Sequence, residues 1–314
     1  MLLILSSADD PHADYVEHRL ASAAGAFQRV DLCDASHLSL AFSTSEPGVP
    51  KLGALDVSHV RGVWYRRPTA PSSRVDASAR AHAQAETRAL FLEVLAAATS
   101  SWFPASPHVV RQADRKPIQL QLARQLAFGV PTTLITNDAD AALDFFRRHD
   151  GDVITKLPSS TACEAPTRVF RYTERLSVHQ LGAMRADLAH CPVMMQAAVR
   201  KKLELRVTVV GEEVFAAEID SQSGARTRVD WRRFAGHTSY RPHALPAEVA
   251  GRCIELVRQL GLLFGAIDLI LTPEGDYVFL EINPTGQWLW VEKLTGQPIG
   301  DAICRTLLAF KERS

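Results

Sequence analysis

The amino-acid sequence predicts an α/β protein with more than one lobe, and three observations support this. Its 314 residues are enough for two or three hydrophobic cores. The composition, 46% hydrophobic and 22% charged, is that of an ordinary globular chain. Short apolar runs of strand length alternate with runs of helix length, which is the pattern of a sheet covered by helices.

The charge balance excludes a general field that would attract nucleic acid or an anionic membrane. Lysine and arginine total 35, and aspartate and glutamate also total 35. A charged substrate must therefore be recognised locally. No apolar run reaches the ~18 residues of a membrane span, and the short apolar start turns polar at Ser6, so we expect a cytoplasmic enzyme.

The first section, residues 1–107, has the pattern of a small α/β domain with a parallel sheet. Strands are expected at Leu2–Leu5, Phe27–Leu32 and Val60–Tyr65, and helices at Ala13–Ala24 and Asp76–Thr99. Residues 100–107 are Ser-Ser-Trp-Phe-Pro-Ala-Ser-Pro, which is the composition of a connector. We place the first domain boundary there.

The second section, residues 108–190, is predicted as a small central lobe of α+β type. Asp114 is expected to cap a helix that carries Pro117 in its first turn and runs to about Phe128. The other elements expected here are a strand at Thr132–Ile135, a helix at about Asp140–His149, a strand at Val153–Leu157 and a short helix near Ser177–Ala189.

The third section, residues 191–314, is predicted as a second lobe built on antiparallel strands. Its expected elements are strands at Val193–Val199, Glu204–Val210 and Glu213–Asp220, a helix at Ala247–Leu260, a hairpin over 265–283 and a last helix at about Ile299–Lys311. The hairpin is the most informative of them, because it places charged side chains on an otherwise apolar pair of strands.

A turn centred between Glu274 and Gly275 would close this hairpin. That register places Asp268 directly opposite Glu281, and Asn283 shares their face. Like charges directly opposite destabilise a sheet, so we expect a cation to offset the repulsion. Carboxylate and amide oxygens suit Mg²⁺, which takes its other ligands from water and phosphates. The alternative is a solvated acidic strand face.

Two lysines are candidates for phosphate binding. Lys156 ends an apolar strand and precedes a Pro-Ser-Ser-Thr loop whose hydroxyl and backbone groups could approach phosphate. Lys116 lies in the first turn of its helix, where free N–H groups favour anions. Taken alone, each could be an ordinary solvated lysine. The sequence contains neither GxxxxGK[ST] nor GxGxxG, so neither a P-loop nor a dinucleotide fingerprint explains a nucleotide here.

Several phrases resemble a known family. They are Asp-Arg-Lys-Pro-Ile-Gln-Leu-Gln-Leu-Ala from Asp114, and the stretches Leu203–Gly211, Val229–Arg232 and Glu281–Trp290. With the order of a Lys-bearing helix, a Lys-ending strand and a carboxylate hairpin, they resemble the ATP-grasp superfamily, and within it the ligases that mature microviridins and other graspetides. Gly62–Pro68 is similar to the pre-ATP-grasp domain of those ligases.

The resemblance implies an ATP-grasp fold with an N-terminal pre-ATP-grasp domain, a small central lobe and a C-terminal lobe. It also implies ATP and Mg²⁺ as cofactors. The implied contacts are Lys116 and Lys156 with the phosphates, Gln196 and the backbone of Ala197–Val199 with adenine, Glu204 with the ribose or the adjoining pocket, and Asp268, Glu281 and Asn283 with Mg²⁺.

The implied reaction is ATP-dependent ligation on a ribosomal precursor peptide. Asp or Glu side chains are activated as acyl phosphates and joined to Ser/Thr or Lys side chains, forming ω-ester or ω-amide macrocycles. The alternative is a ligase, like RimK or glutathione synthetase, that adds an amino acid to a protein terminus or a small peptide. A non-catalytic binding module is disfavoured, because the carboxylates and both lysines are retained. A homodimer is a further implication, and neither nucleic acid nor membrane is an expected partner.

Arginines are candidates for gripping the substrate. Arg206, on the strand predicted to face the hairpin, has a guanidinium fork that matches both a phosphoryl group and a carboxylate. Arg232, in an Asp-Trp-Arg phrase, could bind the acceptor carboxylate or could simply close a surface loop. For Arg66 and Arg67 we favour local pairing over binding of an acidic peptide.

Overall fold

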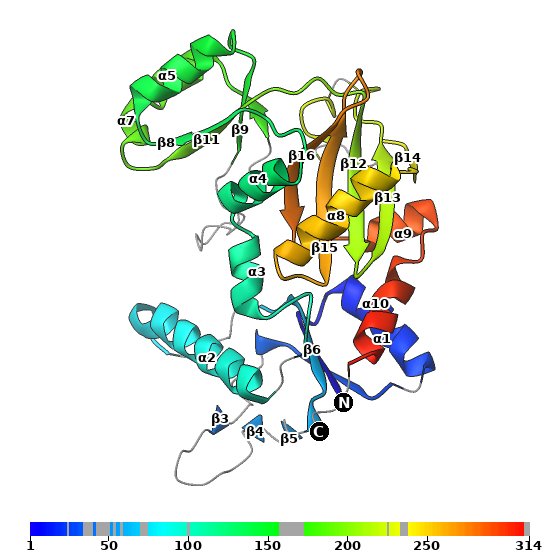
Figure 1. Cartoon of the computed structure of the whole chain (residues 1–314). Coiled ribbons are helices and arrows are strands. Elements are labelled where there is room, and N and C mark those ends of the chain that lie inside the picture. Colours follow the sequence, from blue (N-terminus) through cyan, green and yellow to red (C-terminus); the bar gives the residue numbers. More distant parts are fainter. Residues whose placement is uncertain are drawn as a thin grey trace.

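The computed structural model describes residues 1–23, 25–33, 40–41, 51–52, 55–56, 59–69, 75–98, 101–156, 173–224, 226–232 and 238–310. These residues form mixed α/β structure with one parallel sheet and several antiparallel ones, as predicted. Figure 1 shows the N-terminal part below, the lobe with α5 at the upper left and the C-terminal sheet at the upper right. Within the described ranges, no helix combines the length and apolarity of a membrane crossing.

The N-terminal section builds the parallel sheet, in the order β2-β1-β6-β7. Its strands are β1 (Leu2–Ser6), β2 (Phe27–Val30), β6 (Gly62–Arg67) and β7 (Trp102–Phe103), and its helices are α1 (Pro11–Ser22) and α2 (Ala77–Ala98). A small antiparallel sheet contains β3 (Leu40–Ala41), β4 (Lys51–Leu52) and β5 (Leu55–Asp56). The predicted connector thus contains a strand, because both aromatic side chains of β7 are buried against the sheet.

The central lobe is a four-stranded antiparallel sheet with short helices. Its elements are α3 (Pro107–Ala113), α4 (Lys116–Gln125), β8 (Thr133–Thr136), α5 (Ala139–Arg148), β9 (Val153–Lys156), β10 (Glu174–Arg175), α6 (Val178–Ala183), α7 (Arg185–Leu188) and β11 (Val193–Ala197). The strand order is β10-β9-β11-β8. β11, which we predicted at the start of the third section, is hydrogen-bonded between β9 and β8 and so belongs to this sheet.

The predicted cap of α4 is wrong. Asp114 lies at the C-terminal end of α3, and the residue before α4 is Arg115, which forms no side-chain capping bond. The sequence prediction missed α3, although Ser106 followed by Pro107 is a common helix start. Because α3 ends at Ala113, Asp114 belongs to the turn between two helices.

The C-terminal lobe holds a five-stranded antiparallel sheet in the order β14-β13-β12-β15-β16. Its elements are β12 (Leu203–Val210), β13 (Glu213–Ile219), β14 (Tyr240–Pro242), α8 (Ala247–Gln259), β15 (Phe264–Leu271), β16 (Tyr277–Asn283), α9 (Leu289–Thr295) and α10 (Ile299–Leu308). In Figure 1, α8 lies in front of this sheet, and α10 lies beside α1 of the N-terminal section.

The register of the β15–β16 hairpin confirms the predicted pair, with a correction near the turn. Asp268 lies opposite Glu281, but Leu269 lies opposite Phe279, so Leu280 is an extra residue in β16. The turn is therefore centred half a residue from the predicted place, and this bulge restores the pairing. It also lets Phe279 enter the core while Glu281, two residues on, faces a cleft.

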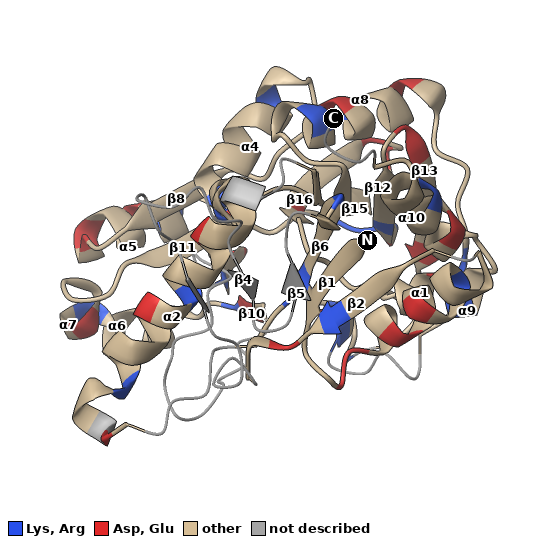
Figure 2. Ribbon diagram, turned by 90° about the horizontal axis from the view of Figure 1, so that it is seen from below, with Lys and Arg blue, Asp and Glu red and all other residues tan. Residues whose placement is uncertain are grey.

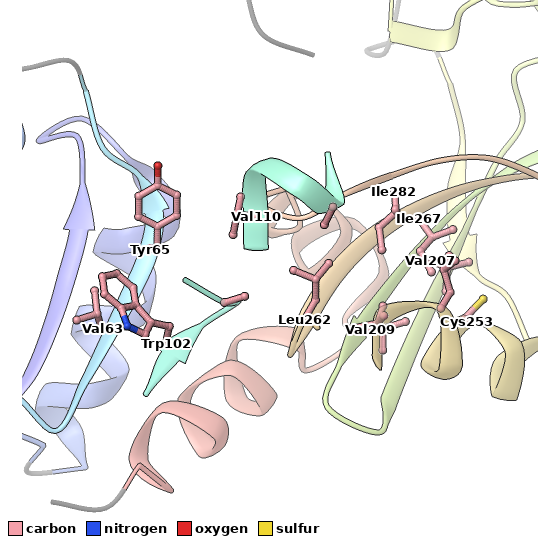
Figure 3. Packing of buried hydrophobic residues seen from close by; sticks show 14 of the residues in the cluster. Val63, Tyr65, Trp102, Val110, Val207, Val209, Cys253, Leu262, Ile267 and Ile282 are labelled. Atoms are coloured by element: carbon pink, nitrogen blue, oxygen red, sulfur yellow. The ribbon is translucent and has the colours of Figure 1, made fainter. Parts of the chain in front are cut away.

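Two buried clusters join the N-terminal and C-terminal parts. The smaller one contains Trp64 and Phe264. The larger one joins the N-terminal sheet to the C-terminal sheet. Figure 3 shows it running from Val63 and Trp102, through Val110 on α3, to Val207 and Ile267. The central lobe has a separate core around Phe145, Val153 and Met195. The N-terminal and C-terminal parts are thus fixed to each other by the two shared clusters, and a cleft lined by residues from all three parts lies between them.

Candidate active site

All the residues predicted to form the site line a single cleft of about 1710 Å³. They come from α4, from the end of β9, and from β11 with the residues that follow it. The others come from β12, from the segment between β13 and β14, and from the β15–β16 hairpin. The set is Lys116, Lys156, Gln196, Ala197, Val199, Glu204, Arg206, Arg232, Asp268, Glu281 and Asn283. Residues up to 167 positions apart in the sequence, from 116 to 283, are thereby brought to one place.

The cleft is strongly cationic although the chain is neutral. Its described lining contains twelve Lys and Arg side chains against seven Asp and Glu side chains, an excess of five positive charges. Figure 2 shows Lys and Arg positions interspersed with Asp and Glu positions along the ribbon in this view. A concave surface of one sign concentrates oppositely charged molecules, so the cleft is suited to anionic ligands.

The two opposed carboxylates of the hairpin are each paired with a cation. The Arg206 Nε atom lies 3.1 Å from Asp268 Oδ1, and the Lys116 Nζ atom lies 3.0 Å from Glu281 Oε2. Arg206 reaches Asp268 because the two are direct cross-strand partners on β12 and β15. Arg206 and Lys116 therefore offset part of the repulsion between the two carboxylates, which the sequence analysis had attributed to a metal ion alone.

The two carboxylates differ in how easily they ionise. Burial alone would raise the pKa of Glu281, but the charges of Lys116 and Lys156 outweigh it and lower that pKa to about 2. Burial dominates at Asp268 and raises its pKa to about 6 against the effect of Arg206. Asp268 is therefore the less compensated carboxylate, and a nearby divalent cation would stabilise its charged form.

The oxygen donors at this face fit Mg²⁺ only in part. Asp268, Glu281 and Asn283 offer two carboxylates and one amide, which are the hard ligands that Mg²⁺ prefers. In the part of the chain that the structure describes, no group of three or more His, Cys, Asp or Glu side chains could hold a metal ion. A cation here would thus need the Asn283 amide and oxygens from water or phosphate.

Lys156 lies at the end of β9 and is only partly exposed, which disfavours an ordinary solvated lysine. Burial, followed by the charges of Lys116 and Lys201, lowers its pKa against the opposing effects of Glu281 and Asp268. The Pro-Ser-Ser-Thr loop that follows lies outside the described residues. Lys156 and Lys116 therefore share the neighbourhood of Glu281.

Gln196 is fully buried, and its side-chain nitrogen and oxygen differ in their hydrogen bonding. Its Nε2 donates to Thr133 Oγ1 over 3.0 Å, whereas its Oε1 accepts no hydrogen bond from the described residues. The backbone N–H groups of Ala197 and Ala198 donate to carbonyls of residues 132 and 152. Those two N–H groups, which the resemblance implied for adenine, are therefore already used.

Arg232 lines the cleft and is held there by its neighbour Asp230, a pairing that the sequence analysis did not predict. Its Nε donates to Asp230 Oδ1 over 2.8 Å, and Asp230 also accepts from the Thr173 backbone N–H. The pairing with Asp230 raises the pKa of Arg232, whose side chain is 47% exposed. The next aromatic residue, Trp231, packs against Trp290 with 5.3 Å between ring centroids.

Two further cleft residues were missed by the sequence prediction. Asp114 lines the cleft, and burial raises its pKa to about 6. Lys201 pairs with Glu204 over 3.0 Å and donates to the Val229 carbonyl. Lys201 could have been noticed in the sequence because it stands three residues before the predicted site residue Glu204. Asp114 was not recognised as a cleft residue because it was predicted to cap a helix. Glu204 is thus already paired within the protein.

The chain matches no protein-family model and no curated protein. The solved structures to which it is similar include two macrocyclases and an ATP-grasp ligase. The macrocyclase MdnC of Microcystis aeruginosa MRC, bound with precursor peptide MdnA, is 28% identical over 98% of both chains, with a TM-score of 0.85. The RiPP-associated ATP-grasp ligase of Chryseobacterium gregarium, in complex with ADP and a leader and core peptide, is 28% identical over 99% of this chain and 97% of that one, with a TM-score of 0.86.

The macrocyclase MdnB of Microcystis aeruginosa MRC is 29% identical over 98% of both chains, with a TM-score of 0.78. All three comparisons extend over nearly the full length of each protein, so they include the N-terminal section, the central lobe and the C-terminal sheet alike. The predicted fold and enzyme class are thereby confirmed, and the chain is an ATP-grasp ligase.

Proposed function

We propose that the enzyme activates Asp or Glu side chains of a ribosomal precursor peptide with ATP and joins them to Ser, Thr or Lys side chains of the same peptide. The observation that carries this proposal is the meeting of two lysines, the acidic hairpin face and Arg206 in one cationic cleft. The similar structures that contain precursor, leader or core peptides support a peptide substrate over a free amino acid.

For the nucleotide, Lys116 and Lys156 would contact the phosphates. The buried Oε1 atom of Gln196 would accept from the exocyclic amino group of adenine, because a buried acceptor without a partner is costly. With the N–H groups of Ala197 and Ala198 used, the Val199 backbone is left as the main-chain contact. The ADP in the Chryseobacterium gregarium complex is consistent with this assignment.

For the metal, Asp268, Glu281 and Asn283 would hold Mg²⁺. When bound, it would neutralise charge on the phosphate oxygens. Lys116, now paired with Glu281, would then turn toward phosphate, because one carboxylate cannot compensate both cations fully. Arg206 keeps further N–H groups besides the Nε that faces Asp268, and these would grip the transferred phosphoryl group or the substrate carboxylate.

The reaction would proceed in two displacements. A carboxylate oxygen of the peptide attacks the γ-phosphorus of ATP, the bond to the ADP oxygen breaks, and an acyl phosphate forms. The hydroxyl or amine of a second side chain then attacks the acyl carbon, its proton passes to water, and phosphate leaves. The protein contributes positioning and charge stabilisation to both steps.

The test is to incubate the full chain with ATP, Mg²⁺ and a peptide encoded beside its gene that is rich in Ser/Thr/Lys and Asp/Glu. Successive losses of water from the peptide, each with one ADP formed, are the expected result by mass spectrometry. Incorporation of a free amino acid with a gain in mass would favour the ligase that extends a terminus. ADP formation without any change in the peptide would contradict the proposal.

Several features expected from the sequence remain predictions. They are the homodimer, the cytoplasmic location and the domain boundaries at residues 107 and 190. Because β11 is hydrogen-bonded into the central sheet, we propose moving the second boundary to the residues after Ala197.

A further inference from the structure

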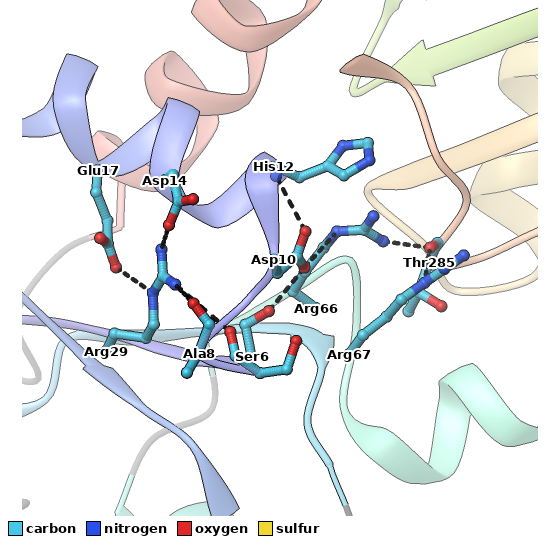
Figure 4. A network of polar contacts seen from close by, with 11 residues as sticks. Ser6, Ala8, Asp10, His12, Asp14, Glu17, Arg29, Arg66, Arg67 and Thr285 are labelled. Atoms are coloured by element: carbon cyan, nitrogen blue, oxygen red, sulfur yellow. Dashed lines mark hydrogen bonds and ion pairs between the residues drawn. The ribbon is translucent and has the colours of Figure 1, made fainter. Parts of the chain in front are cut away.

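The end of the cleft nearest the N-terminal sheet carries four side chains that the proposed function does not use. We call this group the N-terminal wall: His12 at the start of α1, Arg66 and Arg67 at the end of β6, and Lys293 on α9. All four line the cleft. Figure 4 shows the first three gathered beside the loop that carries Thr285.

The two arginines are fixed in place, so this wall is preorganised. Arg66 is 3% exposed, pairs with Asp10 over 3.4 Å and donates to the Thr285 carbonyl. Arg67 donates to the same carbonyl from Nε over 3.0 Å. Thr285 stands two residues after Asn283, so the two arginines hold the segment that directly follows the strand of the proposed metal face.

His12 is a buried polar group aimed at the cleft without a described hydrogen-bond partner for its Nδ1. The residue is 6% exposed, and its ring packs edge-on against Trp288 at 5.1 Å between centroids. Burial and the charges of Arg66, Arg67 and Lys293 lower its pKa to about 3, so the ring is neutral. Buried polar atoms normally have a partner, and here a ligand would supply it.

The wall contains an exposed cation, Lys293, and Arg66 of the wall pairs with a carboxylate, Asp10, whose oxygens are already used. Asp10 pairs with Arg66 and caps α1 through the His12 N–H, so its oxygens are committed. Lys293 lines the cleft, is exposed and has no ion pair with a described residue. Lys293 and the neutral imidazole of His12 thus face the cleft beside the two fixed arginines, and the exposed Asp9 lines the cleft as well. That arrangement suits an anion with two acceptor oxygens.

We propose that the N-terminal wall is a second carboxylate subsite, which binds an acidic side chain of the peptide other than the one being activated. The inference rests on the proposed peptide substrate. Nucleotide phosphates are already assigned to Lys116 and Lys156, and the reacting carboxylate to Arg206. A second anchored acid would set which acidic side chain reaches the phosphoryl donor, because it fixes the register of the peptide along the cleft.

The test uses short synthetic peptides, acetylated and amidated at their ends, with two glutamates separated by glycine spacers of different length. Each is compared with the peptide in which one glutamate is glutamine. Binding to the full chain is measured by calorimetry with and without ADP and Mg²⁺. At the best spacing we expect the diacid to bind about tenfold more tightly, the effect of roughly one charge-assisted contact.

Two variants and one control assign that preference to the wall. Lys293→Gln should reduce the tenfold preference to about threefold or less, and because Lys293 is exposed the fold should be unaffected. His12→Phe keeps an aromatic ring against Trp288 but removes Nδ1, and should reduce it similarly. Lys202→Gln changes an exposed lysine outside the cleft and should leave the preference intact.

Equal binding of diacid and monoacid peptides at every spacing would overturn this inference, and so would an equal loss in Lys293→Gln and Lys202→Gln. Failure of the proposed function has a different signature, namely no ADP binding, or no loss of water from a precursor peptide. The calorimetric titration without nucleotide tests the second subsite whether or not the enzyme binds ADP or modifies a precursor peptide.

Discussion

Single residues in the cleft are distinguished by how their charges are compensated. Glu281 stays ionised because two lysines face it, whereas Asp268 is opposed by burial and depends on Arg206. Replacing Asp268 by Asn removes a metal oxygen and also releases the guanidinium of Arg206. We expect at least a hundredfold loss of turnover, about the 3 kcal/mol of one electrostatic contact made in the transition state.

This first prediction is checked by ADP release in the presence of peptide. Asp276→Asn is the matched control, because Asp276 is an exposed residue of the same hairpin and lies outside the cleft lining. Equal turnover in the two variants would remove Asp268 from the site, provided that circular dichroism shows both to be folded.

Gln196 provides a second residue-scale prediction. Gln196→Leu removes the buried Oε1 that has no described partner and also the donor to Thr133. If adenine supplies the missing partner, the ADP dissociation constant should rise about tenfold, equivalent to roughly 1.4 kcal/mol. The melting temperature without nucleotide should change little, since an apolar group replaces a half-satisfied polar one. Unchanged ADP binding would exclude Gln196 from the adenine pocket.

His12 gives a prediction about pH. Its folded pKa of about 3 lies below the ordinary value of 6.5, because of burial and of Arg66, Arg67 and Lys293, with Asp10 opposing. Between these values the unfolded chain binds a proton that the folded chain does not, so stability falls as pH decreases from about 6.5 toward 3, by up to about 1.4 kcal/mol per pH unit. His12→Phe should flatten urea-unfolding stability between pH 6.5 and 5 relative to the wild-type chain. Parallel curves would show that the ring is not held neutral.

The residues of the site could be predicted from the sequence to the extent that a local pattern or phrase marks them. Lys116, Lys156 and the hairpin carboxylates stand in such patterns, and all line the cleft. His12 could not be found in this way, because what distinguishes it is burial under Trp288 and three cations from other elements. Its role comes only from tertiary packing.

At the scale of elements, the β15–β16 hairpin shows both the reach and the limit of pattern reasoning. The pair Asp268–Glu281 was predicted correctly, yet strict alternation would have put Phe279 on the same face as Glu281. The sequence does carry a sign of the bulge, because the buried residues Phe279 and Ile282 are three apart instead of two. The missed α3 and β7 are short, and their formation depends on packing against the parallel sheet.

The bulge makes a prediction about stability. Phe279 is fully buried and packs near Phe128 at 6.0 Å between centroids, so Phe279→Ala should cost about 3–5 kcal/mol of unfolding free energy. Leu280 lines the cleft, and Leu280→Ala should cost less than about 1.5 kcal/mol. Urea denaturation of the two variants measures this difference. The reverse order would mean that β16 has no bulge and that Leu280 faces the core.

At the scale of the whole molecule, the three cores predict unequal cooperativity. The N-terminal and C-terminal sheets share two buried clusters, and Arg66 and Arg67 add hydrogen bonds to the Thr285 carbonyl. The central lobe is stabilised by a smaller core of its own. Amide hydrogens in β1 and β12 should therefore exchange together at the free energy of global unfolding, while those in β9 and β11 exchange through a lower-energy opening. Hydrogen exchange read by mass spectrometry measures both.

Saturating ADP should slow exchange in β9 and β11 far more than in β1. Lys156 and Gln196 on these strands would contact the nucleotide, and a bound ligand stabilises the folded central lobe by mass action. Equal protection of all four strands without ADP would show that the central lobe opens only with the rest of the chain.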